Sequence, residues 1–174
     1  MSGWRVRGWA GLVALLAVAS RVVGAQGEAA EGPAAGDGRD VPVKVTVSTD
    51  KKVYRPGEVI RITLNAKNTQ PASVTLRFAS GQMFDLEIRR GKDRNGERVW
   101  QWAEGRMFTM ALRSRVLAPG QALTFVENYG SREMERSSPV PVPRLTPGTY
   151  TVVGILTTMG RTPKPFGTAT FVVR

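Results

Sequence analysis

Side chains that could perform acid–base chemistry are scarce in this sequence of 174 residues. There is no histidine and no cysteine, which excludes Ser-His-Asp and Cys-His nucleophilic sites and zinc sites built from imidazoles or thiolates. Asp85 and Glu87 would share one face of a strand, but a solvated strand face explains that spacing more simply, and no other carboxylate cluster suggests a glycosidase pair. We therefore predict no catalytic residues, no metal and no cofactor, and a protein that is not an enzyme.

The strand that carries the two carboxylates belongs to a predicted hairpin. Phe84, Leu86 and Ile88 alternate with charged residues, which indicates a half-buried strand. Asn95-Gly96 favours a tight turn, and Trp100 and Trp102 lie on the returning strand. A two-residue loop would place both tryptophans on the charged, exposed face. An odd-numbered loop, or a bulge at Gly91, would place them in the core, which their large apolar area favours.

The other strands that we expect are short and separated by Pro-Gly turns. This pattern, with no clear helical period, predicts an all-β sandwich that forms one domain over residues 41–174. The segment 107–112 is expected to be a short strand or a turn of helix. The remaining predicted strands cover residues 43–47, 60–66, 74–78, 123–126, 150–156 and 168–173.

Tyr150 suggests a more specific feature of the sandwich. It lies two residues after Pro147-Gly148, at the start of the penultimate strand. This position suits a tyrosine corner, in which the phenol hydroxyl bonds to nearby backbone. The simpler alternative is an ordinary turn followed by a tyrosine in a strand.

The N-terminal residues predict export. Arg5 and Arg7 precede an apolar run of 11 residues from Trp9 to Ala19, and small residues end at Ala25. We interpret residues 1–25 as a signal peptide, because the run is too short to span a bilayer, although an earlier cleavage site near Ala19 stays open. Residues 26–40 are rich in Gly, Ala and acidic side chains and predict a flexible linker. We expect an exported mature chain with no stable membrane insertion.

The domain is strongly basic. Four of the 25 basic and four of the 14 acidic residues precede it, so it keeps 21 against 10 and a net charge of +11. Such a field attracts anionic partners without specifying which. Nucleic acid is not expected as a partner of an exported chain. Arginines spread throughout the sequence are also consistent with a simple compositional preference.

Several of these segments together resemble a known family. The runs SGQMFDLEI, VWQWAEGRMFTMAL, VLAPGQALTF and LTPGTYTVVGIL are similar to the BsuPI family of intracellular proteinase inhibitors, over most of residues 43 to 173. The resemblance implies an immunoglobulin-like antiparallel β-sandwich and inhibition of subtilisin-like serine proteases. It implies no particular inhibitory residues.

Two proline-containing loops could provide the binding edge of such an inhibitor. Residues 130–144 are polar and then proline-rich, and residues 159–167 carry two further prolines. Stiffened loops suit an inhibitor because ordering them beforehand lowers the entropy cost of binding. The simpler interpretation, that both loops are plain connections, is slightly favoured. The candidate partner-binding residues are Met134, Arg136, Pro139, Pro141, Pro143, Arg161, Pro163, Trp100 and Trp102.

We therefore expect an exported, monomeric inhibitor-like domain whose partner is a protein, in particular a serine protease. The alternative is a noncatalytic immunoglobulin-like module for adhesion or assembly in the cell envelope.

Overall fold

The computed structural model describes residues 43–160 and 164–174. The predicted signal peptide and linker, and the candidate contacts Arg161 and Pro163, lie outside these residues. The strands are β1 (Val43–Thr49), β2 (Val53–Tyr54), β3 (Ile60–Asn68), β4 (Val74–Phe78), β5 (Phe84–Arg90), β6 (Arg98–Gln101), β7 (Arg113–Leu117), β8 (Ala122–Tyr129), β9 (Gly148–Leu156) and β10 (Phe166–Val173). One short helix, α1 (Arg132–Ser137), follows β8.

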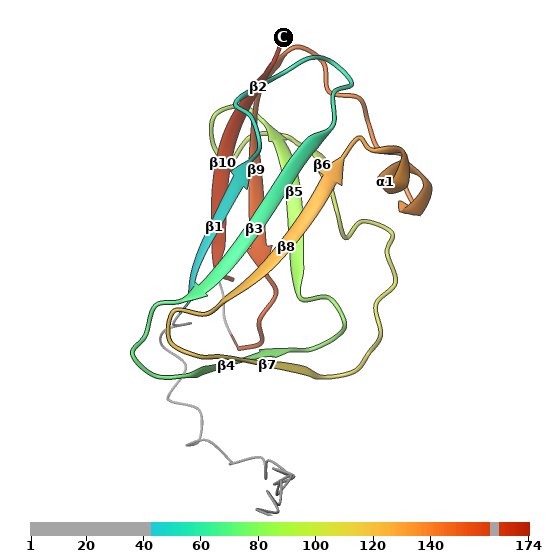
Figure 1. Cartoon of the computed structure of the whole chain (residues 1–174). Helices are drawn as coiled ribbons and strands as arrows, with labels where there is room; N and C mark the ends of the chain where they lie inside the picture. Colours follow the sequence, from blue (N-terminus) through green and yellow to red (C-terminus); the bar gives the residue numbers. More distant parts are fainter. Residues whose placement is uncertain (1–42, 161–163) are drawn as a thin grey trace, which may run out of the picture. The chain divides into compact units, whose positions relative to one another are not determined.

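Two sheets pack against each other, as the sequence predicted. One sheet has the order β1-β3-β8 and the other β2-β10-β9-β5-β6, while β4 and β7 form a separate ribbon at one end of the sandwich (Figure 1). Gly154 of β9 shows how closely the sheets approach, since a Cβ atom there would lie 2.4 Å from Val47 Cγ2 and 2.8 Å from Leu64 Cδ1. The fold is an all-β, immunoglobulin-like sandwich.

One pairing departs from the predicted antiparallel arrangement. The two-residue strand β2 runs parallel to the end of β10, with Val53 opposite Val172 and Tyr54 opposite Val173. All the other strand pairs that the structure describes are antiparallel. Tyr54 is fully buried, and its ring packs edge-on against Phe171 at 5.5 Å.

The central hairpin formed by β5 and β6 contains a bulge that decides its register. Ile88 is opposite Trp100, but Arg89 is opposite Arg98, so Val99 is the extra residue on β6. This bulge reverses the parity that an even-numbered loop would give. Trp100 therefore lies on the core side beside Ile88. The core alternative is confirmed, although the bulge is at Val99 rather than at Gly91.

The connection between β5 and β6 is not a two-residue Asn95-Gly96 turn. The backbone N–H of Arg90 bonds to the carbonyl of Glu97 at 2.8 Å, which leaves a longer loop between them. Gly96 is needed for close approach rather than for a positive φ, because a Cβ atom there would lie 1.8 Å from the carbonyl oxygen of Arg90. The loop also bonds to β9, through Gly91 N–H and the Thr149 carbonyl at 2.8 Å.

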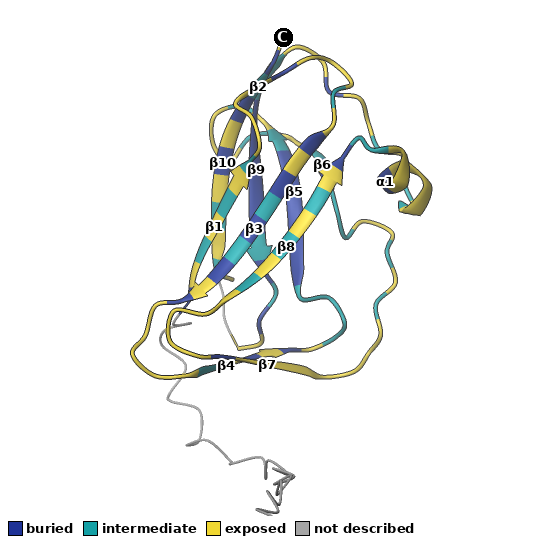
Figure 2. Cartoon of the chain, viewed as in Figure 1, coloured by how far each residue is buried: buried dark blue, intermediate teal, exposed yellow. Residues whose placement is uncertain are grey.

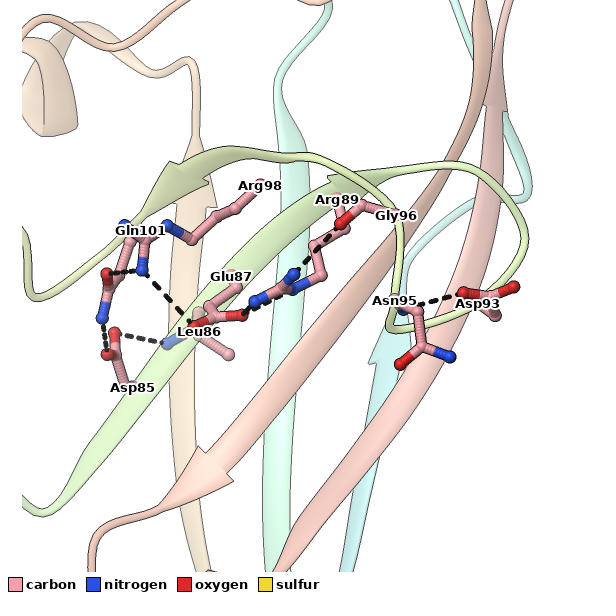
Figure 3. Close-up of polar contacts among 9 residues, drawn as sticks. All are labelled: Asp85, Leu86, Glu87, Arg89, Asp93, Asn95, Gly96, Arg98 and Gln101. Atoms are coloured by element: carbon pink, nitrogen blue, oxygen red, sulfur yellow. Dashed lines mark hydrogen bonds and ion pairs between the residues drawn. The ribbon is translucent and has the colours of Figure 1, made fainter.

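The prediction that Asp85 and Glu87 lie on a solvated face is wrong. They are only 5% and 8% exposed, because β5 is an inner strand and polar side chains cover its outer face (Figure 3). Glu87 accepts from Arg89 Nε at 2.7 Å, and Arg98 lies 3.9 Å away. Asp85 accepts from Gln101 Nε2 at 2.5 Å. Glu87 is therefore ion-paired, and Asp85 is hydrogen-bonded, within the sheet.

The predicted tyrosine corner is confirmed. The Tyr150 hydroxyl donates to the carbonyl of Thr146 at 2.9 Å, and the ring is buried against Phe171 at 5.7 Å. Arg90 Nη2 also donates to the same hydroxyl at 3.1 Å. These bonds fix the start of β9 against the end of β5.

The residues after β8 include a helix that the sequence analysis did not predict. Ser131 caps α1, and its side chain accepts the N–H of Met134 at 3.1 Å. The six-residue helix turns Met134 into the core, where the side chain is 4% exposed. In the described part of the chain, no helix is long and apolar enough to cross a membrane.

Candidate partner-binding face

Trp100 does not reach the surface of the protein. It is 4% exposed and packs edge-on against Tyr129 of β8, with ring centroids 5.0 Å apart. Met134 is also buried, for the reason given above. Both were candidate partner contacts, and for both that prediction is wrong, because the Val99 bulge and α1 direct the side chains inward.

Trp102 connects the core with the segment that follows β6. On one side its indole packs against Phe84 at a centroid distance of 4.3 Å. On the other side Phe108 lies 5.8 Å away, and the guanidinium of Arg106 lies 4.6 Å above the indole. Trp102 is half-buried. Trp102 thus packs against the core on one side and against an exposed segment on the other.

That segment, residues 106–112, is neither a strand nor a turn of helix, contrary to the sequence expectation. It runs irregularly from the end of β6 to the start of β7, along one side of the sandwich (Figure 1). Met107 and Met110 are 97% and 92% exposed, and Leu112 is 76% exposed. We call residues 106–112 the methionine segment.

Three contacts hold the methionine segment at its N-terminal part. Arg106 Nε donates to the carbonyl of Trp102 at 2.8 Å, and Phe108 packs on the indole. The carbonyl of Thr109 accepts the N–H of Gly81 at 2.8 Å. The base of the connection is fixed as well, since Ala103 N–H donates to Asp85 Oδ1 at 3.0 Å. The methionine segment therefore exposes large apolar side chains, while contacts at Arg106, Phe108 and Thr109 fix its backbone.

The proline-rich residues after α1 form a second exposed segment. Pro139, Pro141 and Pro143 are exposed, whereas the alternate residues Val140 and Val142 are half-buried. Figure 2 shows the burial along the connection from α1 to β9. The hydroxyl of the buried Tyr129 donates to the carbonyl of Pro143, and Leu145 is buried in the core. We call residues 139–143 the proline segment. Its prolines face outward because alternate side chains anchor the chain inward.

The two segments adjoin at Gly105, and we call them together the loop face. A Cβ atom at Gly105 would lie 3.0 Å from Val140 Cγ1 and 3.1 Å from Pro139 Cγ. The backbone φ of +69° at Gly105 also favours glycine. Of the predicted contacts within the described residues, the three prolines are exposed on the proline segment, with Pro139 beside Gly105, whereas Trp102 packs against the methionine segment. Arg136 is exposed on α1, three residues before Pro139.

Charges of both signs lie around the loop face, where the exposed arginines outnumber the exposed carboxylates of Glu104, Glu133 and Glu135. Arg113 and Arg115 of β7 are exposed, and so are Arg136 and Arg144. None of the four forms an ion pair among the described residues. Behind the face, burial raises the pKa of the Glu127 carboxyl above its ordinary value, and the nearby Arg106 guanidinium opposes that rise. The face therefore suits a partner with a negative surface.

A separate groove of about 580 Å³ lies on the outer face of the five-stranded sheet. Arg94 lies 4.5 Å above the Phe166 ring at its edge, and the paired Glu87 and Arg89 form part of its wall. The remaining lining residues are Asn95, Val153, Ile155 and Lys164. This mixture of one carboxylate, already paired, with cations and apolar side chains provides neither an acid–base pair nor a nucleophile with its base.

Sequence reasoning missed the exposure of Met107 and Met110. The sequence analysis predicted a short strand or a turn of helix over 107–112 and did not predict which side chains are exposed, because alternation and helical period are the signals that a sequence offers for orientation. The run MFTM fits neither the strand period nor the helical period, and this was the only sequence sign that Met107 and Met110 would be exposed.

The described residues form an immunoglobulin-like sandwich that presents ordered loops. The family comparison identifies it further. The family model "BsuPI: Intracellular proteinase inhibitor" matches residues 47–161, and the chain belongs to this family. The match includes the hairpin, the methionine segment and the proline segment. No curated protein matches the chain.

Solved structures resemble the sandwich only distantly. The DNA glycosylase AlkC of Pseudomonas fluorescens, bound to DNA with an abasic-site analogue, is 17% identical over 76% of this chain and 30% of its own, with a TM-score of 0.41. The CARDB domain of the PF1109 protein from Pyrococcus furiosus is 12% identical over 76% and 87%, with a TM-score of 0.38. Spo0M, a sporulation control protein of Bacillus subtilis, is 18% identical over 76% and 49%, with a TM-score of 0.41. The chain thus spans under a third of AlkC and about half of Spo0M.

Proposed function

We propose that this chain is an exported inhibitor of a subtilisin-like serine protease and that the loop face is its contact surface. The observation that carries the proposal is the loop face itself, where exposed side chains stand on a backbone already fixed by the core. Family membership supports a proteinase as the partner. The absence of histidine and cysteine from the sequence leaves little chemistry for the alternative of an enzyme.

Pre-ordering explains why such a face would bind tightly. Association costs free energy for each loop and side chain that becomes ordered, and a contact surface that is ordered beforehand avoids much of that cost. In the proline segment the pyrrolidine rings restrict φ, and Val140, Val142 and Leu145 hold the chain against the domain. In the methionine segment Trp102 provides the support. The exposed arginines would accelerate encounter with an acidic protease surface.

Inhibition by the full chain is the direct test. We expect saturable inhibition when the chain is titrated against a subtilisin-like protease, with the loop face left intact or nicked slowly, as mass spectrometry of the mixture would show. Binding should weaken as salt is raised, because the surrounding arginines are exposed. A chain that is folded by circular dichroism yet inhibits neither subtilisin-like nor trypsin-like proteases would contradict the proposal. Recovery of an envelope protein instead would favour the assembly module.

Export is a separate part of the proposal, and it rests on the sequence of residues 1–25. The basic start, the short apolar run and the small residues up to Ala25 support removal of a leader. We expect the mature chain to begin at Gln26, and N-terminal sequencing of protein recovered from its source cells checks this. A cytoplasmic chain that keeps Arg5 and Arg7 would contradict export without affecting inhibition.

A further inference from the structure

Met107 has the most exposed large apolar side chain that the structure describes, and it has no packing role in the fold. Its two neighbours, in contrast, are both attached to the same indole. Arg106 bonds to the carbonyl of Trp102 at 2.8 Å and stacks on the ring at 4.6 Å, while Phe108 packs on that ring at 5.8 Å. The backbone of Met107 is therefore held on both sides while its side chain projects into solvent.

The apolar exposure around Met107 is clustered. Met110, Leu112 and Val116 follow it within ten residues and are 92%, 76% and 63% exposed. Single exposed apolar residues are ordinary, but several large ones within ten residues of the chain indicate a surface that binds another molecule. Arg113 and Arg115 border this cluster. The methionine segment and the start of β7 thus expose apolar side chains next to basic ones.

The backbone of Met107 is also available for pairing. Within residues 43–160 and 164–174, neither its N–H nor its carbonyl makes a hydrogen bond. A segment with free backbone groups can add to a partner as an extra strand, while pockets on the partner accept particular side chains. Methionine is unbranched and flexible, which suits a deep apolar pocket.

Resting on the proposed function, we infer that Met107 is the side chain that enters the specificity pocket of the inhibited protease. The partner is accordingly a serine protease whose specificity pocket is apolar. Met110 is held less firmly, because its anchor at Thr109 lies on one side only and the next regular element begins at Arg113. The proline segment supports the methionine segment at Gly105 and forms a secondary contact.

The test compares charge-introducing variants of the full chain. Met107→Lys should weaken inhibition of a subtilisin-like protease with an apolar pocket by roughly 30-fold or more, the size of a contact that dominates an interface. The same variant should gain inhibition of a trypsin-like protease, whose acidic pocket accepts lysine. Met107→Leu should stay within roughly 10-fold of wild type, because the pocket remains filled by an apolar side chain.

Met159→Lys is the matched control, since Met159 is another exposed methionine and lies outside the loop face. It should inhibit as the wild type does. All variants should unfold at the wild-type urea concentration, because these side chains are exposed. Full inhibition by Met107→Lys, or an equal loss in Met110→Lys or Met159→Lys, would overturn this inference while leaving the proposed function intact. A wild-type chain that inhibits no protease would overturn both.

Discussion

Replacement of Trp100 by alanine is expected to lower the free energy of unfolding by about 3 to 5 kcal/mol. The side chain is 4% exposed, stands opposite Ile88 in the hairpin and packs edge-on against Tyr129 of the facing sheet. Its removal leaves a cavity between the two sheets that rigid strands cannot close. Urea unfolding of the full chain, followed by circular dichroism, measures the loss.

Two control variants test whether the loss of stability comes from burial of the Trp100 side chain. Trp100→Phe should lose less than the alanine variant, because an aromatic ring still faces Tyr129. The variant also removes the buried indole N–H, which has no hydrogen-bond partner among the described residues. Met107→Ala should change stability by about 0.5 kcal/mol or less, since its side chain is exposed. If Trp100→Ala were as mild as Met107→Ala, the Val99 bulge and the register that follows from it would be wrong.

Asp85→Ala should destabilise the protein and weaken inhibition together. Oδ1 of Asp85 accepts the N–H groups of Leu86 at 2.8 Å and of Ala103 at 3.0 Å, and Oδ2 accepts from Gln101. A buried donor left without an acceptor costs about 1 to 3 kcal/mol, so we expect a loss of at least about 2 kcal/mol in urea unfolding. Because Ala103 is the base of the connection that carries Met107, the inhibition constant should rise as well.

Asp85→Asn is the matched control, since it retains an oxygen acceptor for the two N–H groups. The variant also tests the pH dependence of stability. Burial raises the pKa of Asp85 above its ordinary value of 3.8, although the hydrogen bonds from Gln101, Ala103 and Leu86 oppose the rise. The folded state therefore binds this proton more tightly than the unfolded chain, and stability falls as pH rises from that ordinary value through the raised one. Asp85→Asn should flatten this fall, and an unchanged pH profile would contradict it.

The strands could be predicted from sequence because their apolar residues alternate. Phe84, Leu86 and Ile88 lie in the core as expected, and the Pro147-Gly148 turn correctly indicated the corner at Tyr150. The hairpin register could not be predicted, because nothing in the types of Val99 and its neighbours specifies a bulge. Asn95-Gly96 was misleading, since the glycine is needed for its small size beside Arg90.

The site was less accessible to sequence reasoning than the fold. Asp85 was assigned to solvent because charge usually indicates exposure, yet β5 is an inner strand whose outer face is covered by Gln101 and the loop after β5. The helix α1 is too short to show a period, so the inward turn of Met134 was missed. The prolines were predicted contacts because of their stiffness, and in the structure all three are exposed, with Pro139 beside Gly105. The proximity of Gly105 and Pro139 arises from tertiary packing, so sequence patterns do not reveal it.

Amide hydrogen exchange in a complex tests the central claim most directly. The full chain would be mixed with a subtilisin-like protease whose catalytic serine is replaced by alanine, so that it binds without cleaving. Because the N–H of Met107 makes no hydrogen bond among the described residues, it should exchange rapidly in the free chain. We predict that the protease slows exchange across residues 106–112 and at Val140 and Val142. Protection confined to other surfaces, such as the groove at Arg94 and Phe166, would contradict the account.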